Sequence, residues 1–197
     1  MIIPIIAYGD PLLRKKAAEI DKHYTGLQPF IEDMFETMYH ANGVGLAAPQ
    51  VGKSIRLFIV DSIQILKRLA EQKDQSENDF KGEAGARQVF INAKTVHKDG
   101  EPWLYNEGCL SIPQIREDIE RPDEITLEFF DENFVSHRQT FDGFTGRVIQ
   151  HEYDHIDGIL FTDHLKPLKR RLLKKKLENI SRGMVDVDYK MKFPVRK

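Results

Sequence analysis

Residues 144–156 read FTGRVIQHEYDHI, and this stretch is predicted to form a metal-binding helix in the core of the fold. It contains His151, Glu152 and His155 in the pattern His-Glu-x-x-His. Residues four apart on an α-helix lie on the same face, so both imidazoles can reach one metal ion while Glu152 stands beside them. The spacing therefore predicts a metal site. The alternative is a surface helix that carries two histidines and an acid by coincidence.

A catalytic metal usually needs a third protein ligand, and the sequence offers several candidates. In a metzincin-type protease the third histidine would stand at position 161, but Phe161 is there and His164 lies three residues further on. A thermolysin-like site would use a later glutamate, for which Glu178 is available in a strongly basic segment. Cys109 is the remaining candidate, because a thiolate is a good ligand for zinc or ferrous iron. The bland alternative for a lone cysteine is a small buried hydrophobe.

Composition excludes several classes of protein. The 197 residues are 41% hydrophobic and 30% charged, and a single cysteine cannot form an internal disulfide, so the disulfide-stapled secreted class is excluded. Totals of 29 basic and 31 acidic residues argue against a protein that coats nucleic acid, and we expect no DNA partner. No stretch approaches the roughly 18 apolar residues of a membrane span, and the apolar opening at 2–7 is too short for a signal peptide. We therefore expect a cytoplasmic protein with no membrane partner.

The pattern of elements predicts an α+β fold. Apolar residues at helical spacing predict an amphipathic helix over 27–38, with Thr25 and Gln28 as a capping box and Asn42-Gly43 as its end. The other expected elements are strands at 55–60, 89–92, 103–107, 125–130 and 135–141, the last two joined by a turn at 131–133, and helices at 144–156 and 165–182, while the sequence also allows a short helix at 63–71. Helices should pack on a mostly antiparallel β-sheet.

The whole chain, 1–197, is expected to form a single domain, because no repeat and no Gly-, Pro- or Ser-rich linker divides it. The polar stretch 62–88 is interpreted as a surface insertion. No structure is predicted for 184–197.

The segment 165–182 is predicted to form an amphipathic C-terminal helix docked on the body of the protein. Its apolar stripe consists of Leu165, Leu168, Leu172, Leu173, Leu177 and Ile180. Its other face carries Lys166, Lys169, Arg170, Arg171, Lys174, Lys175 and Lys176. A basic helix face is usually only solvated, but a local basic patch also suits RNA phosphates.

Three segments together resemble the motifs of the peptide deformylase family. They are GVGLAAPQ at 43–50, EGCLS at 107–111 and QHEYDH at 150–155, and they occur in the family's order. The resemblance extends from the N-terminus to about Leu165. It implies an enzyme that hydrolyses the formyl group from the N-terminal methionine of newly made bacterial polypeptides and releases formate. The implied partners are N-formylmethionyl nascent polypeptides.

The resemblance gives the metal site its chemistry. It implies that Cys109, His151 and His155 hold one divalent metal ion and leave a coordination position for water. The ion would lower the pKa of that water, so that metal-bound hydroxide attacks the formyl carbonyl. Glu152 would take the water's proton as general base and then deliver it to the departing amine as general acid.

The first two motifs are implied to stabilise the oxyanion and hold the substrate. The side-chain amide of Gln50 and the backbone N–H of Leu110 are the implied oxyanion donors. Gly43, Val44 and Gly45 belong to a stretch that pairs with the substrate backbone like an added strand.

Further residues are candidates for specificity and support. Val44, Val148 and Ile149 are expected to form the apolar pocket for methionine, and plain core is the alternative for the last two. Arg116 matches an arginine that lies near the substrate backbone in the family. Asp154 could hold a metal-binding imidazole by accepting its outer N–H, or it could cap a backbone group.

The resemblance favours Fe²⁺ as the metal in the cell, with Zn²⁺, Ni²⁺ or Co²⁺ also compatible with two histidines and a cysteine. Because related enzymes contact the ribosome through a C-terminal helix, the basic helix at 165–182 is expected to do the same. Two alternatives stay open: a zincin-like endopeptidase, and an RNA-binding module in which the metal is structural.

Overall fold

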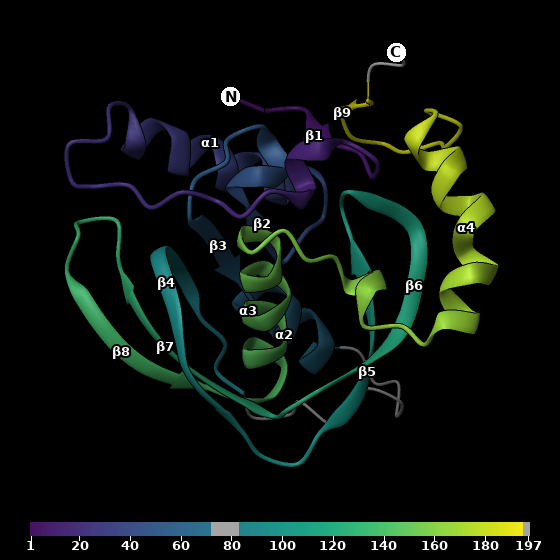
Figure 1. Cartoon of the computed structure of the whole chain (residues 1–197). Coiled ribbons are helices and arrows are strands. Elements are labelled where there is room, and N and C mark those ends of the chain that lie inside the picture. Colours follow the sequence, from purple (N-terminus) through teal and green to yellow (C-terminus); the bar gives the residue numbers. More distant parts are fainter. Residues whose placement is uncertain (72–82, 195–197) are drawn as a thin grey trace.

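The computed structural model describes residues 1–71 and 83–194 of the chain (Figure 1). In chain order, with η for a 3-10 helix, the elements are β1 (Ile5–Ile6), η1 (Pro11–Arg14), α1 (Leu27–His40), β2 (Gly45–Ala47), η2 (Ala48–Val51), β3 (Leu57–Asp61), α2 (Ile63–Glu71), β4 (Arg87–Asp99), β5 (Trp103–Cys109), β6 (Ile112–Arg121), β7 (Glu124–Phe130), β8 (Ser136–Phe141), α3 (Gly143–Ile156), η4 (Phe161–Asp163), α4 (Pro167–Ser181) and β9 (Met191–Lys192).

The strands form one main sheet and two small pairs. The main sheet has five strands in the order β2-β3-β4-β7-β8, and every neighbouring pair in it is antiparallel. β5 and β6 form a separate antiparallel hairpin, and β1 pairs with β9 in parallel. The expected α+β class with a mostly antiparallel sheet is confirmed. β2 is an edge strand, which leaves one side of its backbone open to pairing.

The main sheet is buried on both faces because alternate residues of a strand point to opposite sides. On β3, Leu57 and Ile59 belong to the apolar cluster that includes α1, whereas Phe58 and Val60 belong to the cluster that includes α3. In the second cluster the rings of Phe58 and Phe90 stack with centroids 4.5 Å apart. The helices α1 and α3 therefore cover opposite faces of the sheet.

Helix α3 runs through the middle of the molecule, with β4, β7 and β8 on one side and the β5–β6 hairpin on the other (Figure 1). It begins one residue before the predicted 144–156 and ends at the predicted Ile156. Twelve of its fourteen residues are buried, polar ones included. Burying polar groups costs free energy unless they are hydrogen-bonded. The many buried polar side chains therefore indicate that α3 is a core helix that carries a polar site.

The structure differs from the sequence-based expectation in several elements. β4 extends well beyond the predicted 89–92, and β6 lies at 112–121, where no strand is predicted because the apolar residues stand in a dense run of charges. The predicted capping box of α1 is wrong: Gly26 is the N-cap, and the Gln28 side chain donates to the carbonyl of Glu132 instead. The helix allowed at 63–71 is α2. Of the predicted insertion 62–88, residues 72–82 lie outside the described residues.

Helix α4 docks with only part of its predicted apolar stripe. Leu173, Leu177 and Ile180 are buried in a third apolar cluster together with β6. Leu168 and Leu172, by contrast, are 72% and 70% exposed, so the expectation that they pack on the body is wrong. The helix makes its apolar contact through its second half. Over residues 1–71 and 83–194, no helix is long and apolar enough to span a membrane.

Candidate metal centre

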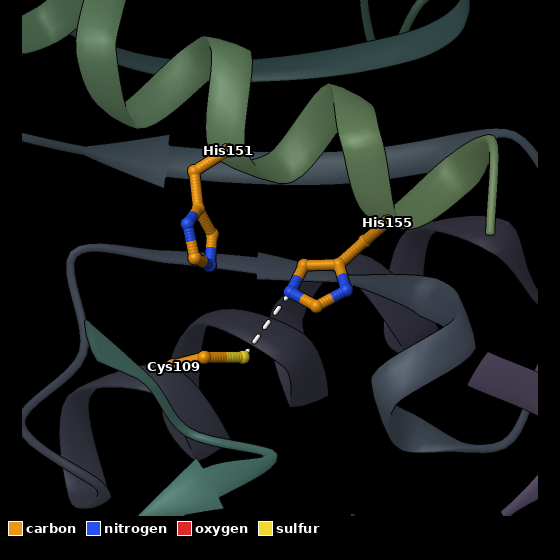
Figure 2. A group of neighbouring side chains, drawn as sticks. All are labelled: Cys109, His151 and His155. Atoms are coloured by element: carbon orange, nitrogen blue, oxygen red, sulfur yellow. Dashed lines mark hydrogen bonds between the residues drawn. The ribbon is translucent and has the colours of Figure 1, made fainter. Parts of the chain in front are cut away.

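Three side chains capable of binding metal converge between α3 and the end of β5 (Figure 2). His151 and His155 lie on the same face of α3, and Cys109 is the last residue of β5. The potential ligand atoms of the three all lie within 4.8 Å of one another. Cys109 Sγ is 3.2 Å from Nε2 of His155. The fold therefore brings the predicted cysteine to the predicted histidine pair.

Glu107 holds one of these imidazoles from behind. Its Oε2 lies 2.9 Å from Nδ1 of His151, so Nε2 is the ring nitrogen left for a metal ion. Metal-binding histidines are commonly oriented in this way by a carboxylate on the outer nitrogen.

Glu107 in turn belongs to a buried network of charged groups. Arg121 donates to both of its carboxylate oxygens at 2.7 and 3.0 Å, and Arg147 approaches Oε1 at 3.3 Å. Arg121 also donates to Asp154 Oδ2 at 2.7 Å, and His164 Nε2 lies 2.7 Å from the same oxygen. Asp154 therefore does accept from an imidazole, but from that of His164. The role predicted for Asp154, accepting the outer N–H of a metal-binding imidazole, belongs instead to Glu107, which contacts His151.

The other candidates for a third ligand lie elsewhere. The ring of Phe161 stacks on that of His151 at 6.0 Å and 27°. His164 is paired with Asp154, and Glu178 is an exposed residue of α4 whose carboxylate lies 4.0 Å from Lys174 Nζ. Neither joins the cluster. The histidine and glutamate alternatives thus lose their ligands.

The electrostatic environment favours the ionised forms of Cys109 and Glu107 but the protonated form of Glu152. Burial raises the pKa of the Cys109 thiol, but the neighbouring His155 and His151 outweigh it and bring that pKa to about 5. Burial likewise opposes ionisation of Glu107, yet hydrogen bonds from His151 and Arg121 hold its pKa well below the usual range. For Glu152 burial dominates over the two histidines and raises the pKa to about 7.

The donor set fits a divalent transition metal. One thiolate and two imidazoles suit zinc, ferrous iron, cobalt or nickel, and three protein ligands leave a coordination position for water or substrate. Glu152 follows His151 on α3 and lines the same cavity as His151 and Cys109. Its Oε2 is buried and finds no hydrogen-bond partner within the described part of the chain. That oxygen is free to accept a proton from a bound molecule.

A cavity of about 760 Å³ opens beside Cys109, His151 and Glu152. Among the predicted site residues, its lining includes Gly43, Val44, Gly45, Gln50, Leu110, Arg116 and Val148. Ile149 is fully buried in the apolar cluster beneath the sheet, so the prediction that it lines the substrate pocket is wrong. Successive residues of a helix point in different directions, which is why Val148 lines the cavity in addition to packing in this cluster, whereas Ile149 packs in the cluster alone.

Gln50 lies against the cysteine with a fixed amide. Its Oε1 accepts from the Ala47 N–H at 2.8 Å, which leaves Nε2 as the donor. Nε2 lies 3.2 Å from Ser111 Oγ and 3.5 Å from Cys109 Sγ. Leu110 forms the turn that follows Cys109 and lines the same cavity.

The two glycines allow close approach at the cavity floor. A Cβ on Gly45 would lie 2.6 Å from Glu152 Oε1, and one on Gly43 would lie 2.8 Å from the side chain of Leu110. Arg116 is exposed and crosses the β5–β6 hairpin, where its Nε donates to Asn106 Oδ1 at 3.0 Å.

The family model for polypeptide deformylase matches residues 2–171. The chain belongs to the polypeptide deformylase family. Peptide deformylases of Christiangramia forsetii and Flavobacterium psychrophilum are 53% and 50% identical to it over all 197 residues, covering 98% and 100% of those relatives. The crystal structure of the Thermus thermophilus peptide deformylase has a TM-score of 0.77 at 34% identity, covering 93% of this chain and 99% of that one. A Legionella pneumophila peptide deformylase gives 0.75 at 34% identity, covering 93% and 98%.

Membership of the deformylase family carries the activity with it. The enzyme is a metal-dependent hydrolase that removes the N-formyl group from nascent peptides. The Cys/His cluster is a candidate for its metal site. Because this activity releases formate and leaves internal peptide bonds intact, it replaces the endopeptidase and RNA-binding alternatives.

Sequence reasoning missed two contributors to this deformylase site. Glu107 stands inside the second motif, and an acid two residues before a metal-binding cysteine on a strand was the available signal. The second is the C-terminal stretch 186–189, which lines the same cavity as the glycines although no structure was predicted for it. No local sequence pattern indicates a role for that stretch, because its position depends on how the chain folds back after α4 to pair β9 with β1.

Proposed function

We propose that Cys109, His151 and His155 hold the catalytic metal of this deformylase and that Glu152 moves the proton. The observation that carries this proposal is the convergence of three ligand atoms within 4.8 Å beside a buried carboxylate with a free oxygen. A divalent ion on these ligands would supply Lewis-acid chemistry, activating water and polarising the formyl carbonyl. Glu107 orients His151 for that purpose through its contact at 2.9 Å.

Glu152 is proposed to act first as general base and then as general acid. Its unpartnered Oε2 can accept the proton of the attacking water and deliver it to the amine as the C–N bond breaks. The tight fit of Gly45 against its Oε1 limits where this carboxylate can lie. A base held in one position can serve both transfers without reorganising.

Gln50 and Leu110 are proposed to stabilise the negative charge that develops on the formyl oxygen. The amide of Gln50 is oriented by the Ala47 N–H, so that Nε2 is presented as a donor beside Cys109. The Leu110 N–H belongs to the turn directly after that cysteine. Donors fixed before the reaction are the most effective kind, because they need no rearrangement when charge appears.

The substrate is proposed to enter along the edge of β2. The residues Gly43–Gly45 line the cavity next to an unpaired sheet edge, which suits an extended peptide of varied sequence. Val44 and Val148 would contact the methionine side chain. Arg116, exposed at the cavity, would contact the peptide backbone.

Formate release from formyl-Met-Ala-Ser tests the assignment. We expect Glu152→Gln to retain metal and lose turnover by at least two orders of magnitude, roughly the contribution of a positioned acid–base group. Cys109→Ala should lose metal as well as activity. Glu128→Gln, an exposed residue of β7, is the matched control and should behave like the wild type. A Glu152→Gln enzyme with near-normal turnover would refute the proposed proton carrier.

We propose ferrous iron as the metal used in the cell. A thiolate-bound ferrous centre should be sensitive to oxygen, so activity should decay in air and persist after replacement by nickel or cobalt. The test is reconstitution of the metal-free protein under anaerobic conditions with each metal in turn. Full activity with zinc and none with ferrous iron would contradict this preference.

We also propose that α4 contacts the ribosome through its basic face. The sharpest variants change Arg171, Lys175 and Lys176, because Lys169, Arg170 and Lys174 already have carboxylates of this chain within reach. Charge reversal of the first three should weaken ribosome binding and steepen its loss with salt. The same reversal at the exposed Lys22, Lys53 and Lys98, which lie outside η1, η4 and α4, gives an equal change of net charge away from this helix. Equal binding of both triple variants would rule out a role for α4.

The chain 1–197 is proposed to act as a single catalytic domain in the bacterial cytoplasm, where formylated chains are made. A single cooperative unfolding transition, coincident by circular dichroism and by loss of activity, is the expected result. Two separate transitions would argue for independent units.

A further inference from the structure

The C-terminal segment after α4 returns to the catalytic side of the molecule. Its β9 pairs in parallel with β1, with Ile5 opposite Met191 (Figure 1). Val185, Met191 and Phe193 pack against the same apolar cluster as α4 and β6. The side chain of Gln114, on β6, donates to the Asp186 carbonyl at 2.7 Å. The segment is therefore attached to the body at both of its ends.

Between these attachments the segment forms one wall of the cavity. Asp186, Val187, Asp188 and Tyr189 line it, together with Cys109, His151 and the residues Gly43–Gly45. This wall lies outside residues 2–171, which the family model matches. It belongs to the part of the chain that follows the catalytic motifs.

Tyr189 connects this wall to the turn at Leu110, directly after Cys109. Its hydroxyl donates to the Leu110 carbonyl at 2.8 Å, while its ring packs against the cluster that contains α1. Burial, with a further contribution from the nearby Cys109, raises the pKa of Tyr189. The hydroxyl therefore stays protonated and acts as a donor.

The turn that carries Leu110 needs such external support. The β5–β6 ladder changes register between Gly108 and Cys109, so regular strand pairing does not fix the turn. The next carbonyl, that of Ser111, is held by the Tyr8 N–H at 2.8 Å. Tyr189 thus fixes the Leu110–Ser111 peptide plane. With its carbonyl held, Leu110 has less freedom to rotate, and this limits the direction of its own N–H in the adjoining peptide plane.

We propose that Tyr189 is a positioning residue for deformylation, which holds Leu110 so that its N–H points at the developing oxyanion. The inference rests on the proposed role of the Leu110 N–H. A donor that can rotate loses part of its effect, because it must be reoriented during the reaction. Removing the hydroxyl should therefore weaken the transition state more than the bound substrate.

The test is Tyr189→Phe, which removes one hydroxyl and keeps the ring. We expect kcat for formyl-Met-Ala-Ser, expressed per bound metal ion, to fall about fivefold, equivalent to about 1 kcal/mol, with KM changed less than about twofold. Tyr24→Phe is the control, because Tyr24 packs against the same apolar cluster and does not line the cavity. It should leave both constants unchanged.

A second variant tests the same inference by loosening the segment that carries Tyr189 and leaving Tyr189 itself unchanged. Gln114→Ala releases the segment at Asp186, and it should lower kcat in the same direction, by about twofold. If both variants release formate at the wild-type kcat, Tyr189 has no positioning role while the deformylase assignment stands. Failure of the wild-type enzyme itself to release formate would instead defeat the proposed function.

Discussion

Glu107 Oε2 and His151 Nδ1 lie 2.9 Å apart in the centre of the protein, one on β5 and the other on α3. This contact ties the strand that ends in Cys109 to the helix that carries both histidines. It also places a buried carboxylate between His151 and two arginines, so metal binding and core stability depend on the same group.

Replacing this carboxylate by Glu107→Gln should weaken both metal binding and folding. Loss of a carboxylate behind a metal-binding histidine typically costs about 10–100-fold in metal affinity. The variant also leaves the buried Arg121 and Arg147 with less compensation, for which we expect about 3–5 kcal/mol of lost stability. Chelator competition and chemical denaturation measure the two effects. Glu128→Gln, in an exposed pair with Arg138, should change neither; an unaltered metal affinity in Glu107→Gln would show that the contact does not orient His151.

Substituting Gly45→Ala should impair catalysis by displacing the acid–base group. The added Cβ would lie 2.6 Å from Glu152 Oε1 and 2.7 Å from its Cγ, so the side chain must move. We expect kcat to fall at least about tenfold, as for a misplaced catalytic group, while metal content is retained. Gly43→Ala is the comparison, since its Cβ meets Leu110 and Met38 and leaves Glu152 in place, so any loss that it causes comes through substrate or oxyanion binding. Equal kcat values for the two variants would speak against a specific effect on Glu152.

Removal of the Gln50 donor should slow turnover without loss of metal. Gln50→Ala takes away the Nε2 that faces Cys109, and loss of one oxyanion donor typically costs about 10²–10³ in kcat. Ser111→Ala, which removes only a hydroxyl 3.2 Å from that Nε2, should cost less than about tenfold. Steady-state formate release, normalised to metal content, distinguishes the two. A larger defect in Ser111→Ala than in Gln50→Ala would contradict the assignment of the donor.

Asp163 should contribute pH-dependent stability at the junction of η1, η4 and α4. Its carboxylate accepts from the Leu160 N–H at 2.9 Å and pairs with Arg14 and Arg170. Burial by itself would raise its pKa, but the hydrogen bond from Arg14 outweighs burial and lowers that pKa below the ordinary 3.8. A lowered pKa stabilises the folded state above the ordinary value, and this stabilisation is lost as the pH falls through the lowered value.

Asp163→Asn should therefore lose about 1 kcal/mol at pH 7, a modest figure because the group is partly exposed and screened. The difference from the wild type should shrink as the pH falls below about 4. Urea denaturation at a series of pH values measures it, with the exposed Glu124→Gln as control. A difference that stays constant down to pH 3 would mean that the carboxylate charge is not responsible.

The features that could be predicted from the amino-acid sequence are those that depend on short-range geometry. The spacing of His151 and His155 fixes them on one face of a helix whatever the rest of the chain does. Apolar periodicity likewise predicted α1, and the turn at 131–133 predicted the β7–β8 hairpin. The three motifs were sufficient to identify the family, because each is a local pattern.

Contacts between residues far apart in the chain could not be predicted and become apparent only in the folded protein. Cys109 reaches the histidines because β5 packs beside α3, and Glu107 becomes their support through the same packing. Tyr189 reaches Leu110 because β9 pairs with β1. Local spacing cannot encode such contacts, since they depend on how elements far apart in the chain bury their apolar faces together.

The same distinction explains the incorrect predictions. Val148 and Ile149 are equally apolar neighbours in the same buried cluster, and only the position of α3 between cavity and sheet makes Val148 line the cavity as well. Leu168 and Leu172 follow the helical period but extend past the surface on which α4 docks. Periodicity specifies the face of a helix, whereas the extent of its contact depends on the shape of the surface that it meets.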